Sequence, residues 1–184
     1  MKKEFEITDL GFIKYFFGIE VEQSEKGIFI YKNKYVKDVL KWFKMDNCKS
    51  TPTPVATSTK LSKEDQGSNI DPTLYTRLIG SLMYLTTIRL DIMYDVSSIS
   101  RFLESPKDSH WQVGKQILRY IAGTTRCGIL YSNTESKVLV GYTDSDFAGS
   151  MDDRKRTFGY VFHLGSGVIS WASKKKPIMT ISST

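Results

Sequence analysis

Three short runs rich in β-branched and aromatic residues occupy the last third of the chain, with glycines in and between them. They are GYTDSDFAG, DDRKRTFGYVFHLG and SGVISWASKKKP. Runs of this kind, separated by turn residues, are typical of consecutive antiparallel strands. They predict a β-meander, which constrains the rest of the fold because a few strands are stable only when a hydrophobic face packs against another element.

The beginning of the chain predicts a second, smaller sheet followed by a helix. The runs EFEITD, KYFFGIEVEQ and GIFIYK favour extended structure, with Gly27 in the turn before the last of them. From Asn33 to Met45 apolar residues recur at helical spacing. Four lysines lie on the opposite side of this predicted helix: Lys34, Lys37, Lys41 and Lys44.

The middle of the chain predicts helices. Residues 49–69 are rich in Thr, Ser and Pro, which indicates a loop or linker. Asp71 followed by Pro72 is a helix-starting pattern, and Asp91 is placed to cap a second helix.

A third helix is expected after a Pro-containing turn. The segment Ser105-Pro106-Lys107-Asp108 resembles a capping box, and Gly123 favours the end of the helix. Strands, then helices, then strands again predict an α+β fold.

Composition places the chain among intracellular proteins. The net charge of +6 is compatible with anionic partners. Cys48 and Cys127 are far apart and outside any C-x-x-C spacing, so we expect no disulfide framework and a reducing compartment, cytoplasmic or nuclear. The N-terminal MKKEFEITDLG lacks the apolar core of a signal peptide, and no stretch approaches the roughly 20 apolar residues of a transmembrane segment. We expect no membrane partner.

Several segments, in order along nearly the whole chain, resemble copia-type retrotransposon polyproteins. ITDLGFIKYFFGIEVEQSEKGIFIYKNKYVKDVLKWFKM is similar to the part of their reverse transcriptases that follows the catalytic palm Asp pair. LYTRLIGSLMYLT, DIMYDVSSISRF and HWQVGKQILRYIAGT resemble the thumb and connection regions. GYTDSDFAGS through ISWASKKKP resembles the opening strands of the ribonuclease H domain.

The resemblance implies a division of the chain into four parts. Residues 1–50 would be the end of the palm with its primer-grip hairpin and a thumb-like helix, and residues 51–70 a linker. Residues 71–127 would be the helical thumb and connection region, and residues 128–184 an incomplete ribonuclease H-like domain. The final Ser182-Ser183-Thr184 are of the types that cap a helix, and no helix follows them. We therefore expect a truncated polyprotein fragment, inactive alone, whose partner is the remainder of the polyprotein if it is translated.

The resemblance also implies site residues. Tyr15-Phe16-Phe17-Gly18 would form the primer-grip hairpin, with Phe17 and Gly18 at the primer, and the helix from Asn33 would track the duplex. Asp144 would be the first metal-binding carboxylate of the ribonuclease H site. In that family a Glu on the next helix and further Asp residues complete a site for two Mg²⁺ ions.

Asp144 and Asp146 are two residues apart, so on a regular strand both side chains point to the same face. Mg²⁺ takes one or two carboxylates, so the pair could hold one ion weakly. The alternative is two exposed carboxylates at a strand end. Hydrolysis by two metal ions needs more ligands than these, so we expect Asp144 to be insufficient alone and no metal to be bound tightly.

Basic residues form three candidate nucleic-acid contacts. They are the four lysines of the first predicted helix, the pair Lys115 and Arg119 at helical spacing, and Arg154 and Lys155 near the start of the second meander run. Such residues bind phosphates, which would give weak, non-specific affinity for duplex nucleic acid or an RNA–DNA hybrid. The alternatives are the solvated side of an amphipathic helix and, in the meander, protection of a strand edge.

The chain departs from the family pattern at several positions. It has Ile88-Arg89-Leu90-Asp91 where family members usually have T-R-P-D. Asp95 replaces a small residue in an otherwise apolar stretch, and a buried, unpaired carboxylate there would be costly or protonated.

Two further functions stay open at this point. One is a non-catalytic basic nucleic-acid-binding module, which a salt-dependent binding titration would distinguish. The other is a metal-dependent transferase that uses Asp144-Ser145-Asp146 as a D-x-D motif, which no Gly-rich nucleotide loop supports. His110 and His163 are isolated from each other and from the cysteines, so we assign them no metal site.

Overall fold

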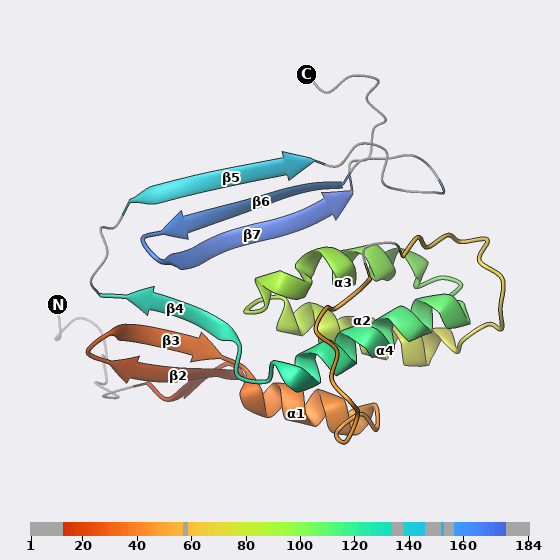
Figure 1. Ribbon diagram of the computed structural model, residues 1–184, viewed down its shortest axis with the longest axis horizontal. Helices are drawn as coiled ribbons and strands as arrows, with labels where there is room; N and C mark the ends of the chain where they lie inside the picture. Colours follow the sequence, from red (N-terminus) through yellow and green to blue (C-terminus); the bar gives the residue numbers. More distant parts are fainter. Residues whose placement is uncertain (1–12, 57–58, 134–137, 146–151, 153–156, 176–184) are drawn as a thin grey trace, which may run out of the picture.

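The computed structural model describes residues 13–56, 59–133, 138–145, 152 and 157–175. Figure 1 shows two antiparallel sheets and a helical middle, which confirms the expected α+β class. The EFEITD run lies outside the described residues, as do Asp146, Arg154 and Lys155.

The first sheet is built from two parts of the chain that are far apart in sequence. Its strands, in spatial order, are β1 (Tyr15–Phe16), β2 (Ile19–Ser24), β3 (Gly27–Tyr31) and β4 (Gly128–Ser132). All neighbours are antiparallel, and Ile30 of β3 lies opposite Ile129 of β4. The sheet that begins the chain is therefore completed by a strand that follows the helical middle.

Four α-helices form the middle of the molecule and contain its core. They are α1 (Asn33–Trp42), α2 (Pro72–Leu85), α3 (Met93–Ile99) and α4 (Asp108–Gly123), with the 3₁₀ turns η1 (Leu90–Ile92) and η2 (Ser100–Phe102) on either side of α3. Each α-helix contributes fully buried side chains, among them Val39, Leu78, Ile99 and Ile117. This shared burial supplies the main apolar stabilisation of the described part of the chain.

The helices α2 and α4 confirm their sequence signals in part. The carboxylate of Asp71 accepts a hydrogen bond from the backbone N–H of Thr73 at 2.9 Å, directly before Pro72. The helix α4 ends at Gly123 as expected. Its beginning is capped by a residue that the sequence did not indicate, because Nδ1 of His110 accepts the backbone N–H of Lys107 at 3.0 Å.

The helix α1 is shorter than predicted. It ends at Trp42, and Lys44 lies beyond it with a φ of +54°. The backbone N–H of Met45 donates to the carbonyl of Leu40 at 2.7 Å, which closes a helix-terminating motif of the kind that usually has glycine in the left-handed position.

Two other local predictions are wrong. The run KYFFGIEVEQ is not one extended segment, because the chain turns at Phe17 and Gly18 between β1 and β2. Asp91 does not cap a helix with its side chain, because its carboxylate pairs with Arg89 instead.

The meander is the second sheet. Its strands, in spatial order, are β5 (Leu139–Ser145), β6 (Thr157–Leu164) and β7 (Gly167–Lys175). The edge strand β7 docks on the helices: the indole N–H of Trp171 donates to the carbonyl of Thr86 at 2.9 Å, and the hydroxyl of Ser97 donates to the carbonyl of Ser173 at 3.0 Å. Figure 1 shows β5 at the other edge of this sheet, and every residue of β5 is exposed.

The described part of residues 51–70 follows the helical core closely. It contains a single β-bridge, between Asn69 and Lys107, and no helix or longer strand. The carbonyl of Ser62 accepts a hydrogen bond from Nε2 of His110 at 3.0 Å, and Leu61 packs against the core. Among the described helices, none is both long and apolar enough to cross a membrane.

Candidate nucleic-acid interface

The turn between β1 and β2 places an aromatic ring in solvent on a constrained backbone. Phe17 and Gly18 form a two-residue connection with φ values of +46° and +76°. Two successive positive φ angles are typical of the tight hairpin turns whose twist matches that of the strands. The side chain of Phe17 is 80% exposed, so the turn presents this ring at the end of the hairpin.

The tyrosine Tyr84, near the end of α2, holds this turn. Its hydroxyl donates a hydrogen bond to the carbonyl of Phe17 at 2.6 Å. A Cβ atom at Gly18 would collide with the same hydroxyl, and the positive φ also disfavours a side chain there. The positive φ and the nearby hydroxyl of Tyr84 both favour glycine at position 18.

A buried lysine, Lys32, contacts both the backbone carbonyl and the ring of Tyr84. Lys32 is only 2% exposed, and its ammonium donates to the carbonyl of Tyr84 at 2.8 Å and to the hydroxyl of Thr87 at 2.7 Å. The same ammonium lies 3.2 Å from the centre of the Tyr84 ring, which is cation–π geometry. Burial lowers the pKa of Lys32 to about 8. No local sequence pattern indicated Lys32 or Tyr84 as part of the site.

The lysines of α1 form an exposed face. Lys34, Lys37 and Lys41 are exposed, and the opposite side of the helix is buried in the core. The backbone N–H of Lys34 donates to the carboxylate of Glu20 at 2.7 Å, which ties the start of α1 to β2. No ion pair among the described residues includes any of these lysines. Lys44 is also exposed, but it lies after the helix.

The second candidate pair is already engaged within the protein. Lys115 and Arg119 are half-buried on α4. Arg119 donates through Nε to the carbonyl of Lys49 at 2.8 Å, and the ammonium of Lys115 lies 5.6 Å from the ring centre of Trp111. These contacts use part of each cation to hold the loop after α1 and the surface of α4.

Asp144 lies in a pocket between β5, β6 and the start of α3. The pocket has a volume of about 310 Å³, and Met93, Tyr94 and Tyr142 contribute to its wall. Among its described lining residues, Asp144 is the one carboxylate. The described residues contain no cluster of three or more His, Cys, Asp or Glu side chains that could hold a metal ion. The described lining alone does not supply the several carboxylates of a two-metal site, and the pairing of Asp144 with Asp146 lies outside the described residues.

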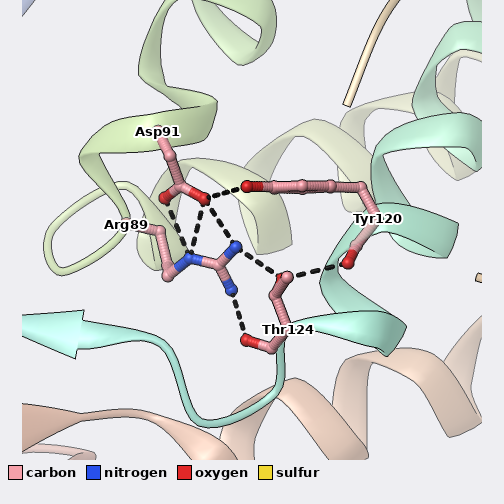
Figure 2. Close-up of polar contacts among 4 residues, drawn as sticks. All are labelled: Arg89, Asp91, Tyr120 and Thr124. Carbon is pink, nitrogen blue, oxygen red and sulfur yellow. Dashed lines mark hydrogen bonds and ion pairs between the residues drawn. The ribbon is translucent and has the colours of Figure 1, made fainter. Parts of the chain in front are cut away.

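A buried arginine joins the segment just before α3 to the end of α4 (Figure 2). Arg89 is 2% exposed and donates to both carboxylate oxygens of Asp91, at 2.9 Å from Nε and 2.7 Å from Nη2. It also donates to the carbonyl and hydroxyl of Thr124, at 2.9 and 2.7 Å, while the hydroxyl of Tyr120 donates to Asp91 at 2.9 Å. The sequence singled out this segment by its departure from the family pattern but did not indicate the network.

The network determines the charge of its carboxylate. Burial alone would raise the pKa of Asp91, but the hydrogen bonds and the charge of Arg89 outweigh burial and hold the pKa below its ordinary value. Asp91 is therefore ionised at neutral pH. The guanidinium of Arg89 lies at the C-terminus of α4, where the helix dipole favours a positive charge. This site is structural: it fixes the chain between α4 and β4.

The chain is similar to known proteins over its whole length. The family model described as reverse transcriptase (RNA-dependent DNA polymerase) matches residues 1–57. The retrovirus-related Pol polyprotein from transposon TNT 1-94 of Nicotiana tabacum is 37% identical over 100% of this chain, and that from transposon RE1 of Arabidopsis thaliana is 39% identical over 100%. The chain spans only 14% and 13% of the lengths of these two relatives.

Another relative is shorter, and the match covers most of its own length. An uncharacterised mitochondrial protein of Arabidopsis thaliana is 34% identical over 100% of this chain and 76% of its own length. No solved structure matches the chain.

Proposed function

The chain belongs to the copia-type retrotransposon Pol polyprotein family, and we propose that within it this segment binds duplex nucleic acid without catalysing a reaction itself. The hairpin turn at Phe17 and the lysines of α1 would make the contacts. The expected ligand is an RNA–DNA hybrid or another duplex, bound weakly and without sequence preference.

One observation carries this proposal. Lys34, Lys37 and Lys41 are exposed on one side of a helix whose other side is buried, and no described acidic side chain pairs with them. Cations held at regular spacing on a rigid element can neutralise successive phosphates at little entropic cost. The contact with Glu20 of β2 holds the start of this helix close to the β1–β2 hairpin.

A salt titration tests the lysine contacts. Replacing Lys37 and Lys41 by glutamate should lower the affinity for any duplex sequence and reduce the slope of log K against log salt by about two, roughly one per lost phosphate contact. The matched control replaces Lys26 and Lys60, which are exposed lysines outside α1, by glutamate. It changes the net charge equally and should leave the slope close to that of the parent chain. Equal slopes in both double variants would contradict the proposal.

We propose Mg²⁺ and ribonuclease H chemistry only for the whole polyprotein. Asp144 is the one carboxylate among the described residues that line its pocket, and hydrolysis by two metal ions needs several. The chain alone should therefore leave an RNA–DNA hybrid intact in Mg²⁺ or Mn²⁺. Cleavage above background that disappears in Asp144→Asn would overturn this part of the proposal.

The division of the chain follows from the same proposal. Residues 1–50 would supply the primer-grip hairpin and the thumb-like helix, and residues 71–127 the thumb and connection after the 51–70 linker. Residues 128–184 would contribute part of a ribonuclease H-like domain. The partner would be the remainder of the polyprotein, in the cytoplasm or the nucleus.

A further inference from the structure

The exposed ring of the hairpin turn belongs to Phe17, whose backbone has a left-handed conformation. This conformation costs free energy for a residue other than glycine. Phe17 has a φ of +46°, which is uncommon for any residue except glycine. Strained backbones of this kind persist where the surrounding structure over-determines them, and they concentrate at functional sites. The ring of Phe17 makes an edge contact with that of Phe16, with centroids 4.5 Å apart, and is otherwise largely open to solvent.

The constraint on the turn comes from α2. The hydroxyl of Tyr84 binds the carbonyl of Phe17, and Lys32 fixes Tyr84 through its backbone carbonyl and its ring. Tyr35 adds an edge contact to the Tyr84 ring, with centroids 4.6 Å apart. The orientation of the turn is therefore set by the helical core as well as by the strands that the turn connects.

The helix that carries the exposed lysines begins close to the hairpin. Glu20, two residues after Gly18, accepts the backbone N–H of Lys34, so the start of the lysine face is close to the hairpin. A nucleotide combines a flat, uncharged base with an anionic phosphate. The exposed ring of Phe17 offers a contact for the base, and the exposed lysines of α1, which begins near the same hairpin, offer contacts for the phosphates.

We propose that Phe17 is a stacking surface for an unpaired nucleobase and that Tyr84 is the residue that positions it. This inference rests on the proposed binding of nucleic acid and adds base contacts to the phosphate contacts of α1. A protein partner would be expected to bind the apolar face of the same sheet, where Phe16, Ile19 and Ile28 line a pocket. Phe17 does not line this pocket, so its exposed ring is not part of that apolar face.

The experiment compares two ligands with the full chain. One is a short oligo-dT, and the other is an abasic oligomer of equal length, which has the same phosphates but no bases. The parent chain should bind oligo-dT about tenfold more tightly, a ratio within the range measured for stacking of one base on an aromatic side chain. Phe17→Leu should remove this preference, and Phe17→Trp should retain it and show quenched fluorescence when oligo-dT binds.

The positioning role of Tyr84 has its own variant. Tyr84→Phe keeps the ring over Lys32 and loses only the hydroxyl that binds the turn, so the preference for oligo-dT should fall about threefold while the salt slope stays unchanged. Tyr31→Phe is the matched control, because it removes a hydroxyl that donates to Glu22 at 2.7 Å in the same sheet but away from the turn. It should retain the full preference.

Three results would overturn these statements, and they are distinguishable. Equal affinity of the parent chain for oligo-dT and the abasic oligomer would refute stacking and leave the lysine contacts intact. A Tyr84→Phe variant that behaves like Tyr31→Phe would refute positioning by Tyr84. Absence of salt-dependent binding to duplex nucleic acid, measured by the salt titration of the proposed function, would refute that function itself.

Discussion

The guanidinium of Arg89 is almost completely buried and is bound by the carboxylate of Asp91, two residues further along the chain. The pair does more than neutralise a charge, because the remaining donors of Arg89 satisfy the chain end of α4 at Thr124. The interaction is bidentate, a geometry that arginine provides and lysine does not.

Removing the guanidinium should therefore be costly. We expect Arg89→Ala to lower the free energy of unfolding by roughly 3 kcal/mol, because it removes the ion-pair partner of Asp91 and the donors that bind Thr124 at the end of α4. Arg89→Lys should recover only a small part of this loss. Chemical denaturation measures both variants. The control is Arg126→Ala, which breaks the exposed pair with Glu22 and should change stability by less than about 1 kcal/mol. Equal losses for Arg89→Ala and Arg126→Ala would contradict the structural role of the network.

His110 should make stability depend on pH. It is fully buried, Nδ1 accepts the N–H of Lys107, and Nε2 donates to the carbonyl of Ser62. Burial lowers the pKa of His110 in spite of the nearby carboxylate of Asp65, so the unfolded chain binds a proton more readily than the folded one. Its contribution to stability is complete above about pH 6.5, the ordinary pKa of histidine, and is lost as the pH falls below that value.

The measurement is the free energy of unfolding between pH 5 and pH 8, taken by denaturant titration of the parent chain and of His110→Asn. The asparagine keeps an acceptor for the N–H of Lys107 and removes the titrating group. The variant should be less stable at pH 8, and the difference between the two proteins should shrink toward pH 5. A difference that stays constant across this range would exclude His110 as the source of the dependence.

Asp95 should act in the opposite sense. Burial raises the pKa of this carboxyl to about 6, as expected from its position in an apolar stretch. The folded chain therefore holds the proton more tightly, and stability is lost as the pH rises from about 4 through 6. Asp95→Asn should raise the free energy of unfolding by about 1–2 kcal/mol at pH 7 and leave it nearly unchanged at pH 4. Asp46→Asn, at an exposed site, is the control. A destabilised Asp95→Asn at pH 7 would show that the carboxylate has a favourable partner.

Hydrogen exchange should separate the meander from the helices. Every residue of β5 is exposed, whereas α2, α3 and α4 each contain residues with 0% exposure. We therefore expect faster amide exchange in the described strands β5, β6 and β7 than across Asp71–Gly123, with β5 the least protected strand of the meander. Equal protection of the two regions, in a sample shown to be monomeric, would refute this expectation.

Residue types that mark helix ends predicted those ends correctly at two positions. The pair Asp71 and Pro72 and the glycine at position 123 marked helix ends that the structure contains. Asp91 carried the same kind of capping signal, yet its carboxylate binds Arg89, because a buried guanidinium is a stronger partner than the backbone N–H groups at the start of α3.

The candidate site was predictable only in part. The exposed lysines of α1 followed from helical periodicity, and the Phe17–Gly18 turn from the resemblance to a family. The contacts that hold the turn did not, because Lys32 and Tyr84 are distant in sequence and their meeting depends on how α2 packs. The same limit applies to β4, whose run GILYS gave no indication that its partner was β3.

The pairing of β3 with β4 has a consequence for the order in which this chain can fold. On a ribosome, β3 stays an open sheet edge while the whole helical middle is synthesised, and it acquires its second neighbour only when residues 128–132 have emerged. Closing so long a loop is slow, and an unpaired edge is a site of association with other chains. A product divided at residue 57, where the match to the reverse transcriptase model ends, would retain that edge permanently. Cutting the sequence at this family boundary therefore divides a sheet between two products.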